Sequence, residues 1–295
     1  MRATLILGLL ARSAAVSAPL PEALHTRISA FPGTVSLYAK NLDTGRAVGI
    51  HESGLVRTAS TIKLAIMAAV FDAVARGQAK WTDPLTLRTS DKVSGSAILA
   101  GETSDRVQLP LKELVRLMIV LSDNTATNMI LERFKADAVN AYLDKIGIRT
   151  TRALRKVRGD GPDTEATAGF SAAGKLPENE KYGLGVSTAE DMVAILEKLE
   201  RGELVSQDAS REMISVLKRC QDATGIRRRL GDLPVANKTG SLDALRSDVG
   251  IVYSKGGRIA MAITVDGMRV DYTPNNAGAL LIADLAKLLV DGLAR

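Results

Sequence analysis

Cysteine, histidine and aromatic side chains are scarce in this chain, and each scarcity excludes a class of site. Cys220 is the only cysteine, so no disulfide can form within the chain. The only histidines are His25 and His51, too few for a multi-histidine zinc site, and a Ser-His-Asp triad would have to use one of them. Aromatic residues make up 3% of the chain, which leaves little surface for stacking nucleic-acid bases. We therefore expect no metal, no organic cofactor and no nucleic-acid partner.

Long apolar runs are also missing beyond the N-terminus. No later segment approaches the roughly 18 apolar residues of a membrane span, so an integral membrane protein is not expected. Residues 1–18 have a basic start, an apolar run and the sequence Val16-Ser17-Ala18 before Pro19, the pattern of a signal peptide cleaved after Ala18. Because Arg12 interrupts the run, a cytosolic N-terminal segment is the alternative. We expect a periplasmic or secreted protein.

The overall composition is that of a soluble globular protein. Apolar residues make up 46% and charged residues 24% of the 295 positions, enough to bury one domain or two interlocked subdomains. The net charge of +6 comes from dispersed lysines and arginines rather than a basic run. This favours a mild attraction to anionic small molecules or envelope polymers.

The spacing of apolar residues predicts helices in the middle of the chain and strands at both ends. In residues 60–77 the apolar side chains recur at i, i+3, i+4 and i+7, and Gly77 stands where a helix would end. Short alternating runs on either side of Asp43-Thr44-Gly45 indicate a hairpin. Further helices are expected at 21–30, 111–120, 124–134, 136–146, 188–201, 206–219 and 275–293, and strands at 34–39, 47–51, 235–239, 248–254 and 258–265.

This order of elements indicates an α+β fold. An antiparallel sheet would be assembled from both ends of the chain, with the helical block inserted between them. Residues 149–185 show no periodicity, and a loop of that length inside a compact domain is either functional or mobile. A pocket is expected where the sheet and the helical block meet.

Three short motifs occur in order along the chain. Ser-x-x-Lys alone arises roughly once by chance in a chain of this length, and residues 215–218 fit it as well. The ordered trio is the specific signal, because together it supplies a nucleophile, a base, a second hydroxyl and a cationic anchor for serine acyl transfer without histidine. The motifs are Ser60-Thr61-Ile62-Lys63, Ser122-Asp123-Asn124 and Lys238-Thr239-Gly240-Ser241.

The first motif supplies the candidate nucleophile and its base. Ser60 is predicted at the start of a helix, where free backbone N–H groups can stabilise an oxyanion. Lys63 lies on the same helix face, and a desolvated lysine close to another cation can accept the serine proton. Taken alone, the motif is better explained as a helix cap followed by a surface lysine, and the other two motifs reverse that preference.

The second motif joins two predicted helices. The Ser122 hydroxyl can relay a proton to a leaving nitrogen, and the Asn124 amide can hold a substrate carbonyl. Because Ser, Asp and Asn are all good N-cap residues, the motif could instead only cap the following helix. The catalytic and the capping interpretations are compatible if Asp123 is the capping residue.

The third motif ends a predicted strand. Lys238 can attract a substrate carboxylate and lower the pKa of Lys63, and the Thr239 hydroxyl can bind the same carboxylate. Gly240 would let a substrate backbone approach the strand, and the Ser241 N–H is a second oxyanion donor. The alternative is an edge strand protected by a lysine.

Together with residues 117–128 (LMIVLSDNTATN), the motifs resemble those of the penicillin-recognising serine enzymes, and class A β-lactamases in particular. The resemblance extends from about Pro21 to Leu293. It implies a β-lactamase/transpeptidase-like fold in one catalytic domain, residues 19–295. An α/β subdomain (about 19–56 and 205–295) and a helical subdomain (about 57–204) would enclose the site.

By matching positions, the resemblance also implies a role for each residue. Ser60 would be acylated with Lys63 as its base partner, Ser122 would shuttle a proton, and Asn124 would bind the substrate amide. Lys238 and Thr239 would bind the carboxylate of a β-lactam or of a peptide C-terminus.

The long loop departs from the family pattern. Class A enzymes carry there a glutamate, within Glu-x-x-Leu-Asn, that activates the deacylating water, and no such sequence occurs in this chain. Ten residues past Gly147, the family spacing reaches Val157. Glu165 is a candidate substitute base, ahead of Asp160 and Asp163, although a solvated loop carboxylate is favoured for Glu165.

Arginines near the third motif are further candidates for binding a carboxylate. Arg246 has the better position, while the triplet Arg227-Arg228-Arg229 is more typical of a solvated helix end.

Three functions stay open at this point. The leading prediction is a monomeric β-lactamase-type serine hydrolase acting on a small molecule. The alternatives are a D-alanyl-peptidase or esterase on the same scaffold, and a penicillin-binding sensor with little turnover.

Overall fold

The structure is a computed structural model that describes residues 19–95, 98–158 and 169–294. The expected signal peptide and the loop carboxylates Asp160, Asp163 and Glu165 lie outside these residues. Among the helices of the described ranges, none is both long and apolar enough to span a membrane.

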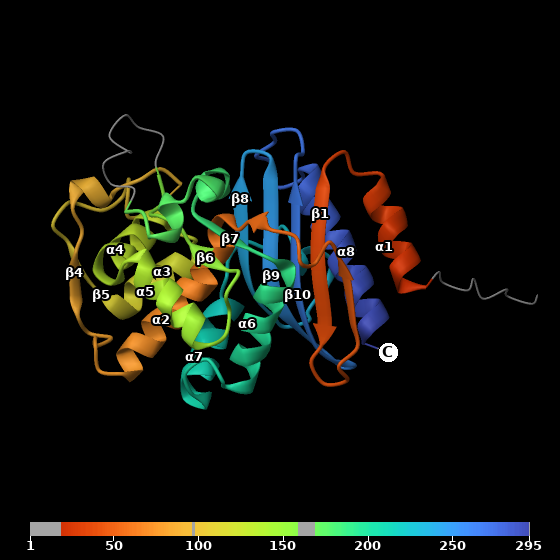
Figure 1. Cartoon of the computed structure of the whole chain (residues 1–295), viewed down its shortest axis with the longest axis horizontal. Helices are drawn as coiled ribbons and strands as arrows, with labels where there is room; N and C mark the ends of the chain where they lie inside the picture. Colours follow the sequence, from red (N-terminus) through yellow and green to blue (C-terminus); the bar gives the residue numbers. More distant parts are fainter. Residues whose placement is uncertain (1–18, 96–97, 159–168, 295) are drawn as a thin grey trace, which may run out of the picture.

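A five-stranded antiparallel sheet joins the two ends of the chain, as the sequence predicted (Figure 1). Its strand order is β2-β1-β10-β9-β8. The central pairing sets Thr34 of β1 opposite Asp266 of β10, which are far apart in sequence. The strands are β1 (Thr34–Asn41), β2 (Ala47–Ile50), β8 (Val235–Leu242), β9 (Leu245–Ser254) and β10 (Gly257–Asp266).

One face of the sheet is covered by the terminal helices α1 (Leu20–Ser29) and α8 (Ala277–Leu293) (Figure 1). Alternate strand residues point to this face, which buries Leu37, Met261 and Val252 against Leu285 of α8. The Asn276 side chain caps α8 by accepting a hydrogen bond from Ala279 N–H at 2.9 Å.

The other face packs against the helical block, and this is where the site forms. Helices α6 and α7 lie against the sheet, and the central helix α2 is buried on almost every side, as expected for a helix that is apolar all round. The helices are α2 (Lys63–Ala75), α3 (Leu111–Val120), α4 (Asn124–Phe134), α5 (Ala136–Lys145), α6 (Ala189–Arg201) and α7 (Gln207–Lys218).

Two predictions of local structure need correction. The helix predicted from Ser60 begins as the short 3₁₀ helix η1 (Ala59–Ile62), and the α-helical part starts at Lys63. The segment predicted as an open loop contains short ordered elements, and its two strands join β3 (Val56–Arg57) in a three-stranded sheet of order β3-β7-β6. They are β6 (Arg152–Ala153), η4 (Ala173–Lys175), η5 (Pro177–Tyr182) and β7 (Gly185–Ser187).

The remaining elements are a two-stranded ribbon and two 3₁₀ helices. They are the ribbon of β4 (Pro84–Thr86) and β5 (Gln108–Pro110), and the 3₁₀ helices η2 (Thr89–Asp91) and η6 (Ile226–Arg229).

Candidate active site

The end of β8 lies directly against η1, and Gly240 permits this contact. A Cβ atom on Gly240 would stand 2.8 Å from the carbonyl oxygen of Thr58 and 3.0 Å from the backbone nitrogen of Ser60. Ala59, just before Ser60, has a positive φ of 46°, an uncommon conformation for a residue with a side chain. The serine turn is therefore held tightly against the third motif.

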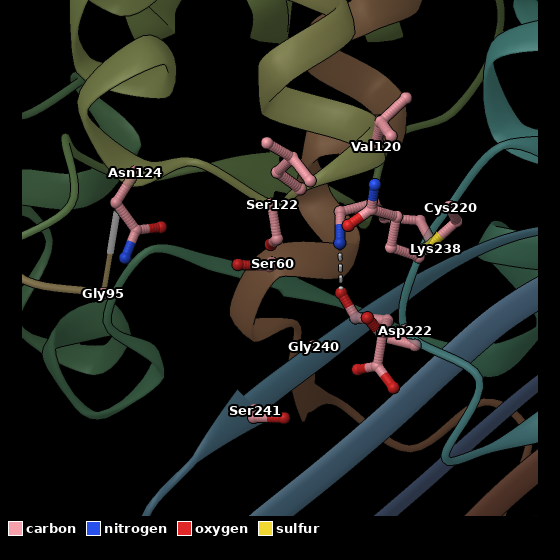
Figure 2. A pocket seen from close by; sticks show the side chains of 13 residues that line it. Ser60, Gly95, Val120, Ser122, Asn124, Cys220, Asp222, Lys238, Gly240 and Ser241 are labelled. Atoms are coloured by element: carbon pink, nitrogen blue, oxygen red, sulfur yellow. Dashed lines mark hydrogen bonds between the residues drawn. The ribbon is translucent and has the colours of Figure 1, made fainter. Parts of the chain in front are cut away.

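All three motifs line one cleft of about 540 Å³, which we call the lysine lobe (Figure 2). Figure 2 shows the Ser60 and Ser122 side chains near its centre, with Asn124 and Lys238 on opposite sides of Ser60. The structure thus brings together residues separated by more than half of the chain. The lining residues are Ser60, Gly95, Val120, Leu121, Ser122, Asn124, Cys220, Gln221, Asp222, Lys238, Thr239, Gly240 and Ser241.

Lys63 is fully buried, which excludes the alternative of a surface lysine. Its Nζ donates hydrogen bonds to the carbonyl oxygen of Ser122 at 2.7 Å, to Asn124 Oδ1 at 2.8 Å and to Ser122 Oγ at 3.3 Å. Burial lowers the pKa of Lys63 well below its ordinary value, the charge of Lys238 lowers it further, and Asp123 opposes the shift. The neutral amine of Lys63 is thereby favoured more than in an ordinary exposed lysine.

The second motif forms a strained junction between α3 and α4. Ser122 has a positive φ of 57°, and such strain concentrates at functional sites. Asp123 caps α4 by accepting a hydrogen bond from Ala126 N–H at 2.9 Å, so the predicted capping role of Asp123 is confirmed. The cap leaves the side chains on either side of it, Ser122 and Asn124, in the cleft wall.

Lys238 is the second fully buried lysine, on β8. Its Nζ donates to the carbonyl oxygen of Thr239 at 2.7 Å, the contact drawn in Figure 2. Burial lowers the pKa of Lys238, while Cys220, Asp248 and Asp222 act in the opposite direction. The predicted depression of the Lys63 pKa by Lys238 is confirmed in direction.

Sequence reasoning missed two acidic residues close to Lys238, Asp222 and Asp248. Asp222 lines the lysine lobe from the irregular segment after α7. Asp248 of β9 is almost fully buried and accepts hydrogen bonds from Asn237 Nδ2 at 2.9 Å and Ile226 N–H at 2.8 Å. Burial raises the pKa of Asp248 to about 7. No motif indicates these residues, because Asp248 comes close to Lys238 only through the pairing of β8 with β9, and Asp222 only through the path of the segment after α7.

Val157 occupies the position reached by the family spacing beside the nucleophile. Its backbone N–H donates to Asn128 Oδ1 at 2.8 Å and its carbonyl accepts from Asn128 Nδ2 at 3.0 Å, which ties the loop to α4. Val157 lines a second cleft together with Ser60 and Asn124. A residue without a titratable side chain therefore lines this cleft at position 157.

This second cleft, which we call the arginine lobe, has a volume of about 340 Å³ and shares Ser60, Asn124 and Ser241 with the lysine lobe. Its lining residues are Arg57, Ala59, Ser60, Asn124, Arg155, Val157, Arg158, Lys181, Tyr182, Gly183, Leu184, Ser241, Leu242 and Asp243.

Arg246 lies on the opposite face of the sheet from Lys238. Its guanidinium donates to the carbonyl oxygens of Leu242 at 2.6 Å, Leu245 at 2.7 Å and Asp271, and its stem approaches Gly278 of α8. Arg246 therefore lines neither lobe, and its geometry does not favour carboxylate binding.

The arginine triplet is also engaged elsewhere. Arg227 bonds Asn237 Oδ1 at 2.6 Å, Arg228 bonds the carbonyl oxygen of Pro274 at 2.7 Å, and Arg229 pairs with Asp284 at 2.7 Å.

Comparison with known proteins gives a consistent family. The profile described as the β-lactamase enzyme family matches residues 19–293. β-Lactamase L2 of Stenotrophomonas maltophilia is 26% identical over 283 residues, which are 88% of this chain and 85% of that protein. The β-lactamase structure from Sphaerobacter thermophilus superposes with a TM-score of 0.79 at 28% identity, covering 93% of this chain and 96% of that one.

A leucine-to-glutamate variant of PBP-A, solved as an acyl-enzyme complex with penicillin G, is also similar. It superposes with a TM-score of 0.77 at 26% identity, covering 93% of this chain and 97% of that chain.

Proposed function

The chain belongs to the β-lactamase enzyme family, and from this membership we propose that it is a serine hydrolase that opens the β-lactam amide through an acyl-enzyme at Ser60. The observation that carries the proposal is the buried Lys63 amine, which bonds Ser122 and Asn124 in the wall of the cleft that contains Ser60. A buried amine of lowered pKa is the base that a serine nucleophile requires.

In the proposed acylation, neutral Lys63 accepts the proton of Ser60 as Oγ attacks the carbonyl carbon. The backbone N–H groups of Ser60 and Ser241 stabilise the oxyanion that forms. When the carbon–nitrogen bond breaks, Ser122 Oγ donates its proton to the leaving nitrogen and takes one from protonated Lys63. The proton balance closes within these groups.

Substrate recognition is proposed for the remaining motif residues. Lys238 and the Thr239 hydroxyl bind the substrate carboxylate, since both line the lysine lobe beside Ser60. The Asn124 Nδ2 donates to the carbonyl oxygen of Ser94 at 3.1 Å and has a second hydrogen for the substrate carbonyl. Arg246 is left out of this set because it lies on the other face of the sheet.

Deacylation is the slow step in this proposal. Val157 cannot activate a water molecule, and a missing general base typically costs about 10²- to 10⁴-fold in the step that it serves. This observation favours a second candidate, a penicillin-binding protein with little turnover. A D-alanyl-peptidase or esterase would use the same acylation residues on another acyl donor. Glu165 stays the proposed substitute base, and export to the periplasm or medium stays a proposal from the sequence.

The test mixes protein lacking residues 1–18 with a chromogenic cephalosporin and follows colour and intact mass together, with Ser60→Ala as control. Sustained hydrolysis that the control lacks supports a β-lactamase. One burst of colour with a stable mass adduct supports the penicillin-binding candidate. Neither colour nor adduct overturns both, and the D-alanyl peptide and ester substrates are then assayed.

A further inference from the structure

Among the residues that the structure describes, more cationic than acidic side chains line the arginine lobe. Four cationic side chains line it: Arg57, Arg155, Arg158 and Lys181. Only Arg57 has an acidic partner among the described residues, in an ion pair of 2.6 Å with Asp266.

Little negative charge faces these cations. Asp243 is the one acidic residue that lines the lobe within the described ranges, and its Oδ1 already accepts a hydrogen bond from the Tyr272 hydroxyl at 2.9 Å. Within the described residues, Arg155, Arg158 and Lys181 therefore line the lobe with the single carboxylate of Asp243, while Glu180 lines an adjoining cavity with the two arginines.

Each of the three cations contacts a neighbouring group, although Arg158 and Lys181 are exposed to solvent. Arg155 is half-buried, and its Nη1 donates to the carbonyl oxygen of Lys156 at 3.0 Å. Arg158 lies 5.5 Å from the centre of the Phe170 ring, and Lys181 lies 5.1 Å from that of Tyr182. Burial lowers the pKa of Arg155 to about 10 and the nearby charge of Arg158 adds to the shift, because the two positive charges repel each other. An anion between them would relieve this repulsion.

The position of the lobe decides which part of a substrate it can contact. The two lobes meet at Ser60, Asn124 and Ser241, so an acyl group on Ser60 borders both lobes. In the proposed function, the carboxylate on the leaving-group side binds Lys238 in the lysine lobe. The acyl side chain is then left to extend into the arginine lobe.

We propose that the arginine lobe is an anion subsite, in which Arg155 and Arg158, with Lys181, bind a carboxylate on the acyl side chain of the substrate. The preferred acyl donor then carries two carboxylates, one on each side of the scissile amide. Guanidinium groups suit this role because they bind carboxylates in a bidentate way. The inference rests on the proposed function, since it assigns the substrate class of the same site.

The first experiment compares benzylpenicillin with carbenicillin, which differ by one carboxylate on the acyl side chain. The second-order rate constant of acylation is measured for each by intact mass, and their ratio is the readout. We expect carbenicillin to be favoured, and Arg155→Gln or Arg158→Gln to lower the ratio about tenfold, the effect of one charge-assisted contact of about 1.4 kcal/mol.

Two further variants make the result specific. Arg158→Lys keeps the charge and should retain part of the preference. Arg149→Gln removes the same charge from an exposed arginine that lines neither lobe, and should leave the ratio unchanged. A ratio near one in the wild type, or one that responds equally to Arg149→Gln, overturns the subsite.

Binding to Ser60→Ala separates this inference from the proposed function. Calorimetry measures the dissociation constants of both penicillins for Ser60→Ala with and without Arg158→Gln. If carbenicillin binds more tightly and loses that advantage in the double variant, the subsite stands even when the wild type is not acylated. If the wild type is acylated but the two penicillins bind Ser60→Ala equally, the function stands and the subsite is wrong. If neither acylation nor preferential binding is seen, both fail.

Discussion

Lys63 and Lys238 are two fully buried amines in one site, and the charge of Lys238 lowers the pKa of Lys63. An amine without water prefers its neutral form, and a neighbouring positive charge strengthens that preference. For this reason the charge on Lys238 has a second effect besides attracting a carboxylate. It keeps Lys63 available as a base.

Removing the charge of Lys238 should therefore shift the pH dependence of acylation. Lys63 reacts when it is deprotonated, so the rate constant rises with pH through the pKa of Lys63. Because Lys238 lowers that pKa, Lys238→Gln should raise it and move the rising limb to higher pH. The measurement is the acylation rate constant from pH 5 to 10 by rapid mixing and intact mass.

The control for this prediction is Lys218→Gln, which removes a lysine charge from the end of α7, outside both lobes. The midpoint of its acylation rate against pH should match that of the wild type. Lys238→Gln also loses the carboxylate anchor, which lowers its acylation rate constant at every pH. The midpoint of its pH profile does not depend on the height of that profile. An unshifted midpoint in Lys238→Gln would mean that the two amines are not coupled.

Asp248 should make folding stability fall as pH rises toward neutrality. Its pKa is raised from 3.8 to about 7 in the folded chain, so the folded state binds the proton more tightly than the unfolded state does. Its favourable contribution is complete below the unfolded pKa of 3.8 and is lost as pH rises through about 7. The full effect is on the order of 4 kcal/mol at most.

Asp248→Asn tests whether Asp248 causes this fall in stability with pH, because asparagine stays neutral at every pH. The free energy of unfolding, from urea denaturation at pH 5 and pH 8.5, should fall less in the variant than in the wild type. Asp232→Asn, on the turn before β8, serves as a control with the same chemical change. Equal pH dependence in Asp248→Asn and the wild type would show that Asp248 does not carry the shift.

At the scale of elements, the segment from β6 to β7 depends on side chains from other parts of the chain. Asn128 of α4 holds Val157, and Asn140 of α5 exchanges hydrogen bonds with Ala153 at 2.8 and 2.9 Å. This anchoring fixes the backbone of residue 157 next to Ser60, so the chemistry at that position is set by its side chain alone.

Val157→Glu should therefore accelerate hydrolysis of the acyl-enzyme. The substitution places a carboxylate in the cleft that contains Ser60, and a positioned general base contributes about 10²- to 10⁴-fold. Since the new carboxylate also meets Arg155 and Arg158, we expect the low end of that range. The measurement is the loss of the mass adduct after removal of excess penicillin.

Val157→Gln is the matched control, because it has the same length and polarity but accepts no proton at neutral pH. Its adduct should decay at the wild-type rate. Equal acceleration by both variants would point to better access of water rather than to base catalysis.

These elements also show where sequence reasoning reaches its limit. Helix ends were predictable because their capping residues are local, as with Asp123 before α4 and Asn276 before α8. The ordered backbone at Ala153 and Val157 was not predictable, because the side chains that hold it, Asn140 and Asn128, belong to other helices. Arg246 was misjudged for a similar reason, since the face that a strand residue points to depends on a register that the sequence does not state.

At the scale of the whole molecule, the site exists because the two ends of the chain form one sheet. β8 holds the third motif against η1, and β8 is itself held through β9 and β10 to β1. The sequence indicated this closure from strand-like runs at both ends. It could not indicate the buried side chain that fastens the ends together, because that role appears only when the turn after β1 meets the C-terminus of α8.

Asn41 is that side chain. It is fully buried, and its Nδ2 donates to the carbonyl oxygens of Leu293 at 2.9 Å and Gly256 at 3.0 Å. Its Oδ1 accepts from the backbone N–H groups of Asp43 at 3.0 Å and Thr44 at 3.2 Å. The N-terminal hairpin, the turn between β9 and β10 and the end of α8 are thus joined at one amide.

Asn41→Ala should lower the free energy of unfolding by about 3 kcal/mol, because it leaves buried backbone groups without partners. Urea denaturation measures this, with Asn275→Ala as a control on an exposed asparagine that should change stability by less than about 0.5 kcal/mol. Because Asn41 lines neither lobe, the folded fraction of Asn41→Ala should acylate at the wild-type rate. A stable Asn41→Ala, or one that folds but acylates slowly, would show that closure of the sheet and assembly of the site are not linked in this way.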